Sequence, residues 1–339
     1  MSTGLVRGAQ AKVIRLARAP MRVSLAGGGT DLPSYATRRG AKVLSVAIDR
    51  YVAVTVFPRS FDGEIRACWE EVETVADVDR MRNQFAAAAL RRAGPRSAVQ
   101  LASHTDVPSG TGLGSSGAFT VALLHALRGS ATGVELAEEA SAVEMSDLDR
   151  PVGKHDQYIA ALGGLRLLHI DQDLRVRPEE LDLRPDVRAY VEQRLLLFHT
   201  GFSRDAGQVL TAQDRMTRFG DADTLGVLDA IGGIVPRMRE AVTTGRVDDI
   251  GPLLHEHWAA KTRLSRGVSN DRIDRLYKLA REAGADGGKL LGAGGGGFLL
   301  LSSAAGRAAE LRAALTDQGA TELPFGIDTG GSRVTELPL

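Results

Sequence analysis

The sequence predicts a two-domain protein of mixed strands and helices, with strands concentrated in the first half and helices in the second. The chain has 339 residues, which is more than one hydrophobic core usually holds and enough for two domains. β-Branched runs recur through residues 13–104, whereas helical spacing of apolar residues prevails from residue 206 onward. Residues 171–188 form a polar connection between these halves, and we place the domain boundary there.

The elements follow from local patterns. Alternating or β-branched runs predict strands over residues 13–17, 21–25, 41–56 (long enough for two strands), 65–69, 99–104, 165–170, 195–199 and 298–301. Apolar residues at helical spacing predict helices over residues 77–92, 115–127, 133–144, 153–162, 206–218, 224–243, 247–265, 271–284 and 306–319. The first helix is expected to end before Gly94 and Pro95, which stop helices.

Composition excludes several classes of function. Lys and Arg together number 42, as do Asp and Glu, so the net charge is zero and neither nucleic acid nor a membrane surface is expected as main partner. The single cysteine, Cys68, excludes an internal disulfide framework and suits a reducing cytoplasm. Residues 1–12 are polar and read as a flexible tail rather than a secretion signal. We expect a cytoplasmic protein, monomeric or homodimeric, that acts on a small molecule.

The most informative stretch is residues 106–128, where a glycine-rich turn leads into an apolar helix pattern. Glycines allow positive φ and a close approach of the backbone to a ligand. A helix that starts at Ser115 or Ser116 would direct unpaired N–H groups and its positive dipole end into the turn. These features together predict a phosphate-binding loop.

Two other nucleotide motifs compete for this assignment. Gly112, Gly114 and Gly117 match the G-x-G-x-x-G of dinucleotide-binding folds. That motif requires a following parallel strand with an acidic residue, but another helical pattern follows instead, so a nicotinamide-dependent dehydrogenase is the weaker alternative. A Walker A loop is excluded, because Leu290 follows Gly288 and Lys289 where a hydroxyl is required for Mg²⁺.

Three glycine clusters lie far apart, at residues 27–29, 110–117 and 292–297. Each alone could be a tight turn. Residues 19–31 (APMRVSLAGGGTD), 108–118 (PSGTGLGSSGA) and 290–297 (LLGAGGGG) together resemble, in order, the three motifs of the galactokinase, homoserine kinase, mevalonate kinase and phosphomevalonate kinase superfamily, the GHMP kinases. The resemblance covers nearly the whole chain after the tail.

This resemblance implies an α+β fold of two domains with the active site between them. The N-terminal, ATP-binding domain would resemble the second domain of ribosomal protein S5, with a left-handed βαβ unit, and would span residues 13–185. The C-terminal domain, residues 186–339, would be ferredoxin-like.

Within the superfamily the chain is most similar to the heptose 7-phosphate kinases. The similarity rests on residues 27–31 (GGGTD), 153–158 (GKHDQY) and 261–270 (KTRLSRGVSN), although His155 stands where we expect glutamine in those enzymes. It implies an ATP-dependent sugar kinase that phosphorylates the anomeric hydroxyl of D-glycero-D-manno-heptose 7-phosphate to the 1,7-bisphosphate. The alternative is a fucokinase- or galactokinase-like 1-kinase of a free sugar.

The resemblance also implies the catalytic and cofactor residues. Asp156 would be the base that takes the proton of the sugar hydroxyl, and Arg22 would steady the transferred phosphoryl group. Ser116 and Glu144 would hold Mg²⁺. The ATP phosphates would be bound by Pro108, Ser109, Gly110, Thr111, Gly112, Leu113, Gly114, Ser115 and Ser116.

The sugar would be bound by residues from several parts of the chain: Gly29, Thr30, Asp31, Gly153, Lys154, His155, Arg204 and Lys261. Arg204 and either Lys261 or Arg263 are candidates for a phosphate already present on the substrate. More ordinary roles are a helix cap for Asp156 and a solvated helix face for Glu144. A non-catalytic binding protein of the same fold is a further alternative, but Asp156 and Ser116 are both present.

Overall fold

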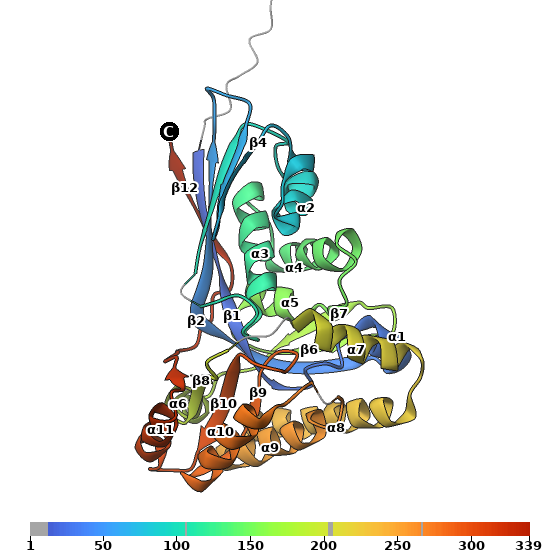
Figure 1. The fold of residues 1–339 in the computed structure, drawn as a ribbon, viewed down its shortest axis with the longest axis vertical. Coiled ribbons are helices and arrows are strands. Elements are labelled where there is room, and N and C mark those ends of the chain that lie inside the picture. Colours follow the sequence, from blue (N-terminus) through green and yellow to red (C-terminus); the bar gives the residue numbers. More distant parts are fainter. Residues whose placement is uncertain (1–12, 106, 203–205, 266) are drawn as a thin grey trace, which may run out of the picture.

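The computed structural model describes residues 13–105, 107–202, 206–265 and 267–339. Within these residues the strands form one sheet of eight and one of four (Figure 1). The mixed α and β fold is therefore as predicted. No helix in the described part of the chain is long and apolar enough to cross a membrane.

The larger sheet is built around one long antiparallel pair of strands. Its members are β1 (Val13–Ala26), β2 (Ala41–Pro58), β3 (Ile65–Cys68), β4 (Val72–Val75), β5 (Val99–His104), β6 (Leu165–Ile170), β7 (Val176–Glu180) and β12 (Arg333–Pro338). The order is β12-β1-β2-β5-β3-β4, with β6 pairing with the first residues of β2, and β7 with β6. The short helix α1 (Pro33–Arg39) joins β1 to β2.

Two strand predictions were wrong in the same way. Residues 13–17 and 21–25 belong to a single strand, and residues 41–56 form one strand rather than two. β1 and β2 pair along nearly their whole lengths, and the register shifts between Pro20 and Met21. Such an irregularity accommodates Pro20, which lacks the backbone N–H, and lets β1 continue past it.

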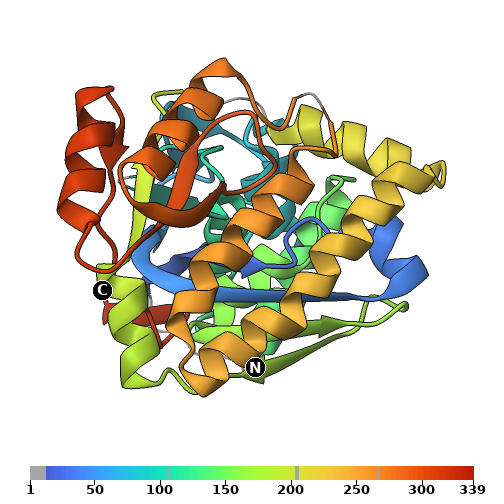
Figure 2. The ribbon, with the colours of Figure 1, turned by 90° about the horizontal axis from the view of Figure 1, so that it is seen from below.

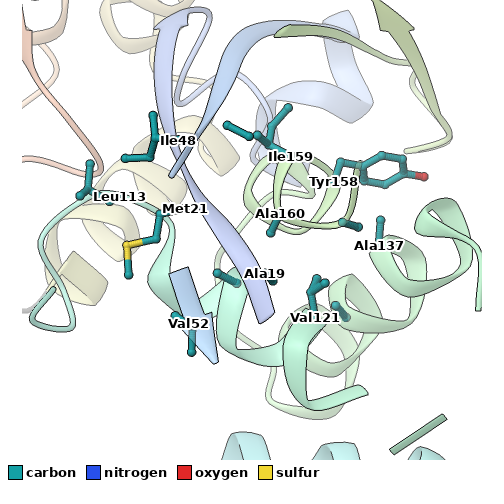
Figure 3. Packing of buried hydrophobic residues seen from close by; sticks show 14 of the residues in the cluster. Ala19, Met21, Ile48, Val52, Leu113, Val121, Ala137, Tyr158, Ile159 and Ala160 are labelled. Carbon is teal, nitrogen blue, oxygen red and sulfur yellow. The ribbon is translucent and has the colours of Figure 1, made fainter. Parts of the chain in front are cut away.

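Helices of the first half cover one face of the larger sheet (Figure 1). They are α2 (Gln84–Ala93), α3 (Ser115–Arg128), α4 (Gly133–Ala142) and α5 (His155–Leu162), with a 3₁₀ turn (Val78–Arg80) and a π-helical turn (Val143–Asp147). The N-terminus of α3 lies where the sequence predicted it, and it follows Gly114 in the left-handed conformation, at φ +76°. Figure 3 shows Ala19, Met21 and Ile48 of the sheet in one core with Val121, Tyr158 and Ile159 of the helices.

The smaller sheet belongs to the second half of the chain. Its order is β11-β8-β10-β9, all antiparallel, and its strands are β8 (Leu195–His199), β9 (Ala285–Leu290), β10 (Phe298–Ser303) and β11 (Thr321–Glu322). The helices are α6 (Pro185–Gln193), α7 (Ala206–Arg218), α8 (Ala222–Thr244), α9 (Ile250–Lys261), α10 (Asp271–Glu282) and α11 (Ala308–Asp317), with a 3₁₀ turn (Val247–Asp249). The polar connection at residues 171–188 contains β7 and the start of α6, which the sequence analysis did not predict.

The two halves share one core. Ile234, Val235 and Met238 of α8 pack into the same cluster as β1 and β2, and α8 lies beside α9 across the lower end of these strands (Figure 2). A second cluster lies between the smaller sheet and the helices α10 and α11. Since β12 pairs with β1, the chain also returns to the larger sheet at its end. The division at residues 185 and 186 remains a proposal.

Candidate active site

A cavity of about 1180 Å³ is lined by all three glycine clusters. Gly28 and Gly29 come from the turn after β1, Gly112 and Gly114 from the loop before α3, and Gly292 from the loop between β9 and β10. Segments separated by more than 250 residues therefore meet at one site, which explains why the sequence carries three glycine clusters.

The second and third clusters touch directly. At Gly112, where φ is +86°, a Cβ would lie 2.7 Å from the carbonyl oxygen of Leu291. A Cβ on Gly292 would lie 2.5 Å from the Cα of Gly112, and the Phe298 N–H donates to the Thr111 carbonyl at 3.1 Å. Only glycine permits so close an approach of the two backbones. The third cluster therefore packs directly against the predicted phosphate-binding loop.

The structure separates the nine residues of that loop into two groups. The cavity is lined by Pro108, Ser109, Gly110, Gly112, Gly114, Ser115 and Ser116. Thr111 is buried and its hydroxyl donates to the Pro108 carbonyl at 2.9 Å. Leu113 is also buried, and its carbonyl accepts the Arg22 N–H at 3.0 Å. These two side chains shape the loop and do not line the cavity.

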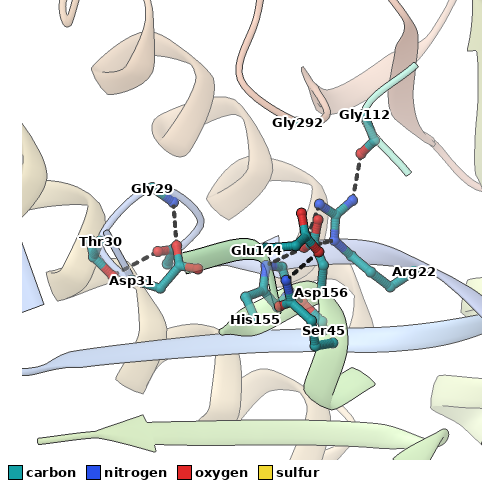
Figure 4. Close-up of polar contacts among 12 residues, drawn as sticks. Arg22, Gly29, Thr30, Asp31, Ser45, Gly112, Glu144, His155, Asp156 and Gly292 are labelled. Carbon is teal, nitrogen blue, oxygen red and sulfur yellow. Dashed lines mark hydrogen bonds and ion pairs between the residues drawn. The ribbon is translucent and has the colours of Figure 1, made fainter. Parts of the chain in front are cut away.

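Arg22 and Asp156 form an ion pair at the centre of the site (Figure 4). The Arg22 Nη2 lies 2.7 Å from Asp156 Oδ1, Nε donates to the same oxygen at 2.9 Å, and Nη1 donates to the Gly112 carbonyl. Burial acts to raise the pKa of Asp156, but the charge and hydrogen bond of Arg22 outweigh it and hold that pKa below its ordinary value. The carboxylate is therefore ionised at neutral pH and faces the glycine loop.

Asp31 lies in the turn after β1 and reaches into the same cavity. Gly153 packs closely against it: a Cβ at residue 153 would clash with both the carboxylate and the backbone carbonyl of Asp31. Burial, with the nearby charge of Asp156, raises the pKa of Asp31 to about 6. The Gly29 N–H donates to Asp31 Oδ1 at 3.3 Å, whereas Thr30 is buried and its hydroxyl donates to the Gly27 carbonyl at 2.7 Å, away from the cavity.

The two residues before Asp156 differ in what they contact. His155 lines the cavity, and its Nε2 lies 2.5 Å from the Ser45 hydroxyl. Burial lowers the pKa of His155 to about 3, so the ring is neutral. Lys154 instead pairs with Glu138 at 2.7 Å and does not line the cavity.

Glu144 comes from the π-helical turn after α4 and is 1% exposed. Its Oε1 accepts a hydrogen bond from Gln157 Nε2 at 2.7 Å, and Ser116 lines the same part of the cavity. Burial, with the charge of Asp156, raises the pKa of Glu144 to about 7, while hydrogen bonds from Gln157 and Ser116 act against this shift. The buried side-chain oxygen of Gln157 has no partner among the described residues. Hard oxygen donors of this kind suit Mg²⁺.

Buried basic residues line the cavity from the second half of the chain. Lys261, at the end of α9, is 7% exposed and donates to the carbonyls of Leu290, at 3.2 Å, and Gly292. Lys289 of β9 and His257 of α9 also line the cavity, and the sequence analysis missed both. Of the other phosphate candidates, Arg263 is exposed and does not line the cavity, and Arg204 lies outside the described residues.

Aromatic side chains line the cavity beyond the glycine loop. Trp69 and Phe119 make an edge-to-face contact with ring centroids 5.5 Å apart, and the Arg150 guanidinium lies 4.9 Å from the Phe85 ring centroid. None of the three aromatic residues was expected at the site from the sequence, because their positions in strand and helix patterns are also those of core residues.

Two family models match the chain. The model described as "GHMP kinases N terminal domain" matches residues 81–164, and the one described as "GHMP kinases C terminal" matches residues 238–321. The first match includes the phosphate-binding loop, Glu144 and Asp156, and the second includes Lys261, Lys289 and the third glycine cluster.

Individual proteins are similar over most of the chain. A D-glycero-alpha-D-manno-heptose 7-phosphate kinase of Campylobacter jejuni is 31% identical over 84% of this chain and 87% of its own length. An L-fucokinase/L-fucose-1-P guanylyltransferase of Bacteroides fragilis is 26% identical over 82% of this chain and 33% of its own. The crystal structure of a D-glycero-D-manno-heptose 1-phosphate kinase from Bacteroides thetaiotaomicron shares the fold, with a TM-score of 0.78 at 22% identity, and covers 96% of this chain and 99% of its own.

Proposed function

Since this chain belongs to the GHMP kinases, which are ATP-dependent phosphotransferases acting on an alcohol group, we propose that its acceptor is D-glycero-D-manno-heptose 7-phosphate. The reaction places a phosphoryl group on the anomeric hydroxyl and yields the 1,7-bisphosphate and ADP. The observation that carries the proposal is the ion pair of Arg22 and Asp156 in a cavity lined by all three glycine clusters. Heptose 7-phosphate is proposed as the acceptor because of the similarity to the Campylobacter jejuni enzyme.

Asp156 is the proposed base. As the anomeric oxygen forms its bond to the γ-phosphorus, the bond from that phosphorus to the bridging oxygen breaks, ADP leaves, and the hydroxyl proton passes to Asp156. The pKa of this carboxyl lies below its ordinary value, so the group is ready to accept a hydrogen bond at neutral pH. Arg22 remains charged throughout, because a guanidinium does not give up its proton in a protein. It stabilises the negative charge on the transferred group.

The loop before α3 is the proposed ATP phosphate site. Backbone N–H groups of residues 110–116 would face the phosphates at the N-terminus of a 14-residue helix. Ser116 and the buried Glu144 would hold Mg²⁺, which neutralises phosphate charge when it is bound. The side-chain oxygen of Gln157 fits this assignment as a further hard donor on a residue bonded to Glu144, since it has no partner among the described residues.

For the acceptor we propose Gly29, Asp31, Gly153, His155 and Lys261 as the residues that bind sugar groups. The Asp31 carboxylate accepts hydrogen bonds from sugar hydroxyls, and the lack of a side chain at Gly153 lets Asp31 approach α5. We assign Thr30 and Lys154 to holding the neighbouring turns, because their side chains bond to the Gly27 carbonyl and to Glu138.

A kinase of a free sugar is the second candidate, favoured by the similarity to the Bacteroides fragilis fucokinase over most of this chain. A coupled ADP-release assay across heptose 7-phosphate, heptose 1-phosphate, free heptose, fucose and galactose separates the two. We expect the highest kcat/KM with heptose 7-phosphate. Turnover of a free sugar with none of any sugar phosphate would overturn the proposal in favour of the second candidate.

A further inference from the structure

Two lysines in the cavity are buried, with no carboxylate partner in the described part of the chain. Lys261 is 7% exposed and Lys289 is 3% exposed. Among the residues that the structure describes, neither lies within ion-pair distance of an acidic side chain. The Asp156 carboxylate, in the same cavity, is bound by Arg22. Buried lysines are normally paired with an anion, so these two side chains need an explanation.

In its protonated form, each of these lysines has more N–H groups than its existing contacts use. Lys261 donates to the carbonyls of Leu290 and Gly292, so a protonated Lys261 has one further N–H group to donate. Lys289 lies 3.1 Å from His257 Nδ1 and a long 3.5 Å from the Leu25 carbonyl. Its third N–H has no acceptor within the described residues. Both side chains, when protonated, therefore keep one N–H group to donate, and both residues line the cavity.

The neighbouring charges are unfavourable in the absence of a ligand. Burial lowers the pKa of Lys289 well below its ordinary value, and the positive charges of Lys261 and Arg22 lower it further. Burial and both lysines also keep His257 neutral by lowering its pKa. An anion placed among these groups would supply the missing negative charge and accept the unused N–H groups.

The position of the pair points to the acceptor side of the cavity. Along β1, Arg22 contacts Leu113 of the proposed ATP phosphate site (residues 108–116, called the ATP loop below), and the Leu25 carbonyl lies beside Lys289. The turn that carries Asp31 follows directly after β1. Lys289 and its partner His257 therefore lie along β1 between the residues that meet the ATP loop and the turn proposed to bind the sugar.

We propose that Lys289, together with Lys261 and held by His257, forms the site for the phosphate group that the acceptor sugar already carries. This inference rests on the proposed function, because it gives that function its selectivity. A free sugar would bring no anion to these two buried lysines, and a site with unpaired buried polar groups discriminates strongly against the ligand that fails to satisfy them.

The kinetic test uses Lys289→Met, which removes the charge while keeping a long apolar side chain, with the exposed Lys278→Met of α10 as matched control. We expect KM for heptose 7-phosphate to rise at least 10-fold and KM for ATP to stay within twofold. The ratio of kcat/KM for heptose 7-phosphate to kcat/KM for free heptose should fall by the same factor as KM for heptose 7-phosphate rises. An unchanged KM for the sugar phosphate, or an equal rise in both KM values, would overturn the inference.

A second measurement does not depend on turnover. With ADP and Mg²⁺ saturating the nucleotide site, inorganic phosphate should raise the melting temperature of the wild type and of Lys278→Met, but not that of Lys289→Met. Equal protection of all three would refute the anion site. Selective loss of protection, in a protein that turns over no sugar phosphate, would keep the anion site and reject only the proposed function.

Discussion

Arg22 and Asp156 lie 134 residues apart in sequence, yet both Nε and Nη2 of the guanidinium contact the same carboxylate oxygen, Oδ1, at 2.9 and 2.7 Å. The third guanidinium nitrogen contacts the Gly112 carbonyl, so one side chain links the base to the ATP loop. The main-chain N–H of Arg22 also bonds to that loop, at Leu113. The geometry of β1 thus fixes the distance between the proposed base and the proposed phosphate site.

Asp156→Asn should abolish most of the activity. The amide keeps the size of the side chain but cannot accept the hydroxyl proton, and general base catalysis contributes roughly 10²- to 10⁴-fold in rate. We expect kcat to fall by about that factor while KM for ATP changes little, as measured by steady-state ADP release. The exposed Asp317→Asn is the control. Equal rates in wild type and Asp156→Asn would remove the base assignment.

Gly112→Ala should damage the ATP loop. The new Cβ would lie 2.7 Å from the Leu291 carbonyl oxygen, at a φ of +86° that side chains rarely adopt. Strain of this kind costs roughly 1–3 kcal/mol, so we expect a lower melting temperature and a raised KM for ATP. Gly226→Ala is the matched control, because it lies within α8 with nothing within 4 Å of its new Cβ, and it should be neutral or stabilising. Equal effects of the two substitutions would contradict the close approach of the two glycine loops.

Each glycine cluster could be recognised from the sequence, because glycine is the residue type that positive φ and close backbone approach require. That the three clusters form one site was implied by the resemblance to the GHMP kinases. Gly112 and Gly292 need no knowledge of the fold to be noticed. The same holds for the start of α3, where the turn and the apolar helix pattern adjoin.

Other parts of the site could not be predicted, because tertiary contacts decide them. Lys289 lies in a short segment with two glycines and two charged residues, a composition typical of a loop, and only pairing with β10 and packing against α9 make it a strand. Sequence position also does not fix side-chain direction: Thr30 and Lys154 lie beside Asp31 and Asp156 but point away from the cavity. β1 continues past Pro20, and residues 41–56 form one strand rather than two, because β1 and β2 pair with each other along nearly their whole lengths.

Binding of Mg²⁺ should depend on pH through Glu144. Burial, with the charge of Asp156, raises the pKa of Glu144 to about 7, so protons compete with the metal below that pH. We expect the half-saturating Mg²⁺ concentration to rise about 10-fold per pH unit as pH falls below 7. Glu144→Gln should raise that concentration roughly 10- to 100-fold at pH 8 and lose the pH dependence. The exposed Glu282→Gln is the control, and an unchanged Mg²⁺ requirement in Glu144→Gln would reject the ligand assignment.

Stability of the unliganded protein should rise with pH above 7. Burial, with the charge of Arg22, lowers the pKa of Lys261 to about 7 from 10.5. Between these values the unfolded chain holds a proton that the native protein lacks. Unfolding therefore takes up a proton, and the free energy of unfolding increases with pH, by at most ~1.4 kcal/mol per pH unit for one group. Urea denaturation of wild type and Lys261→Met at pH 7 to 9.5 measures this. The variant should show a smaller increase, and identical slopes would contradict the buried, uncharged state of Lys261.

The position of the new phosphate tests the central claim most directly. Phosphorus NMR of the reaction with heptose 7-phosphate, ATP and Mg²⁺ should show a second sugar phosphate signal coupled to the anomeric proton, while the original 7-phosphate signal remains. A new phosphate coupled to any other sugar proton would contradict the proposed chemistry, as would ADP formation without a second sugar phosphate.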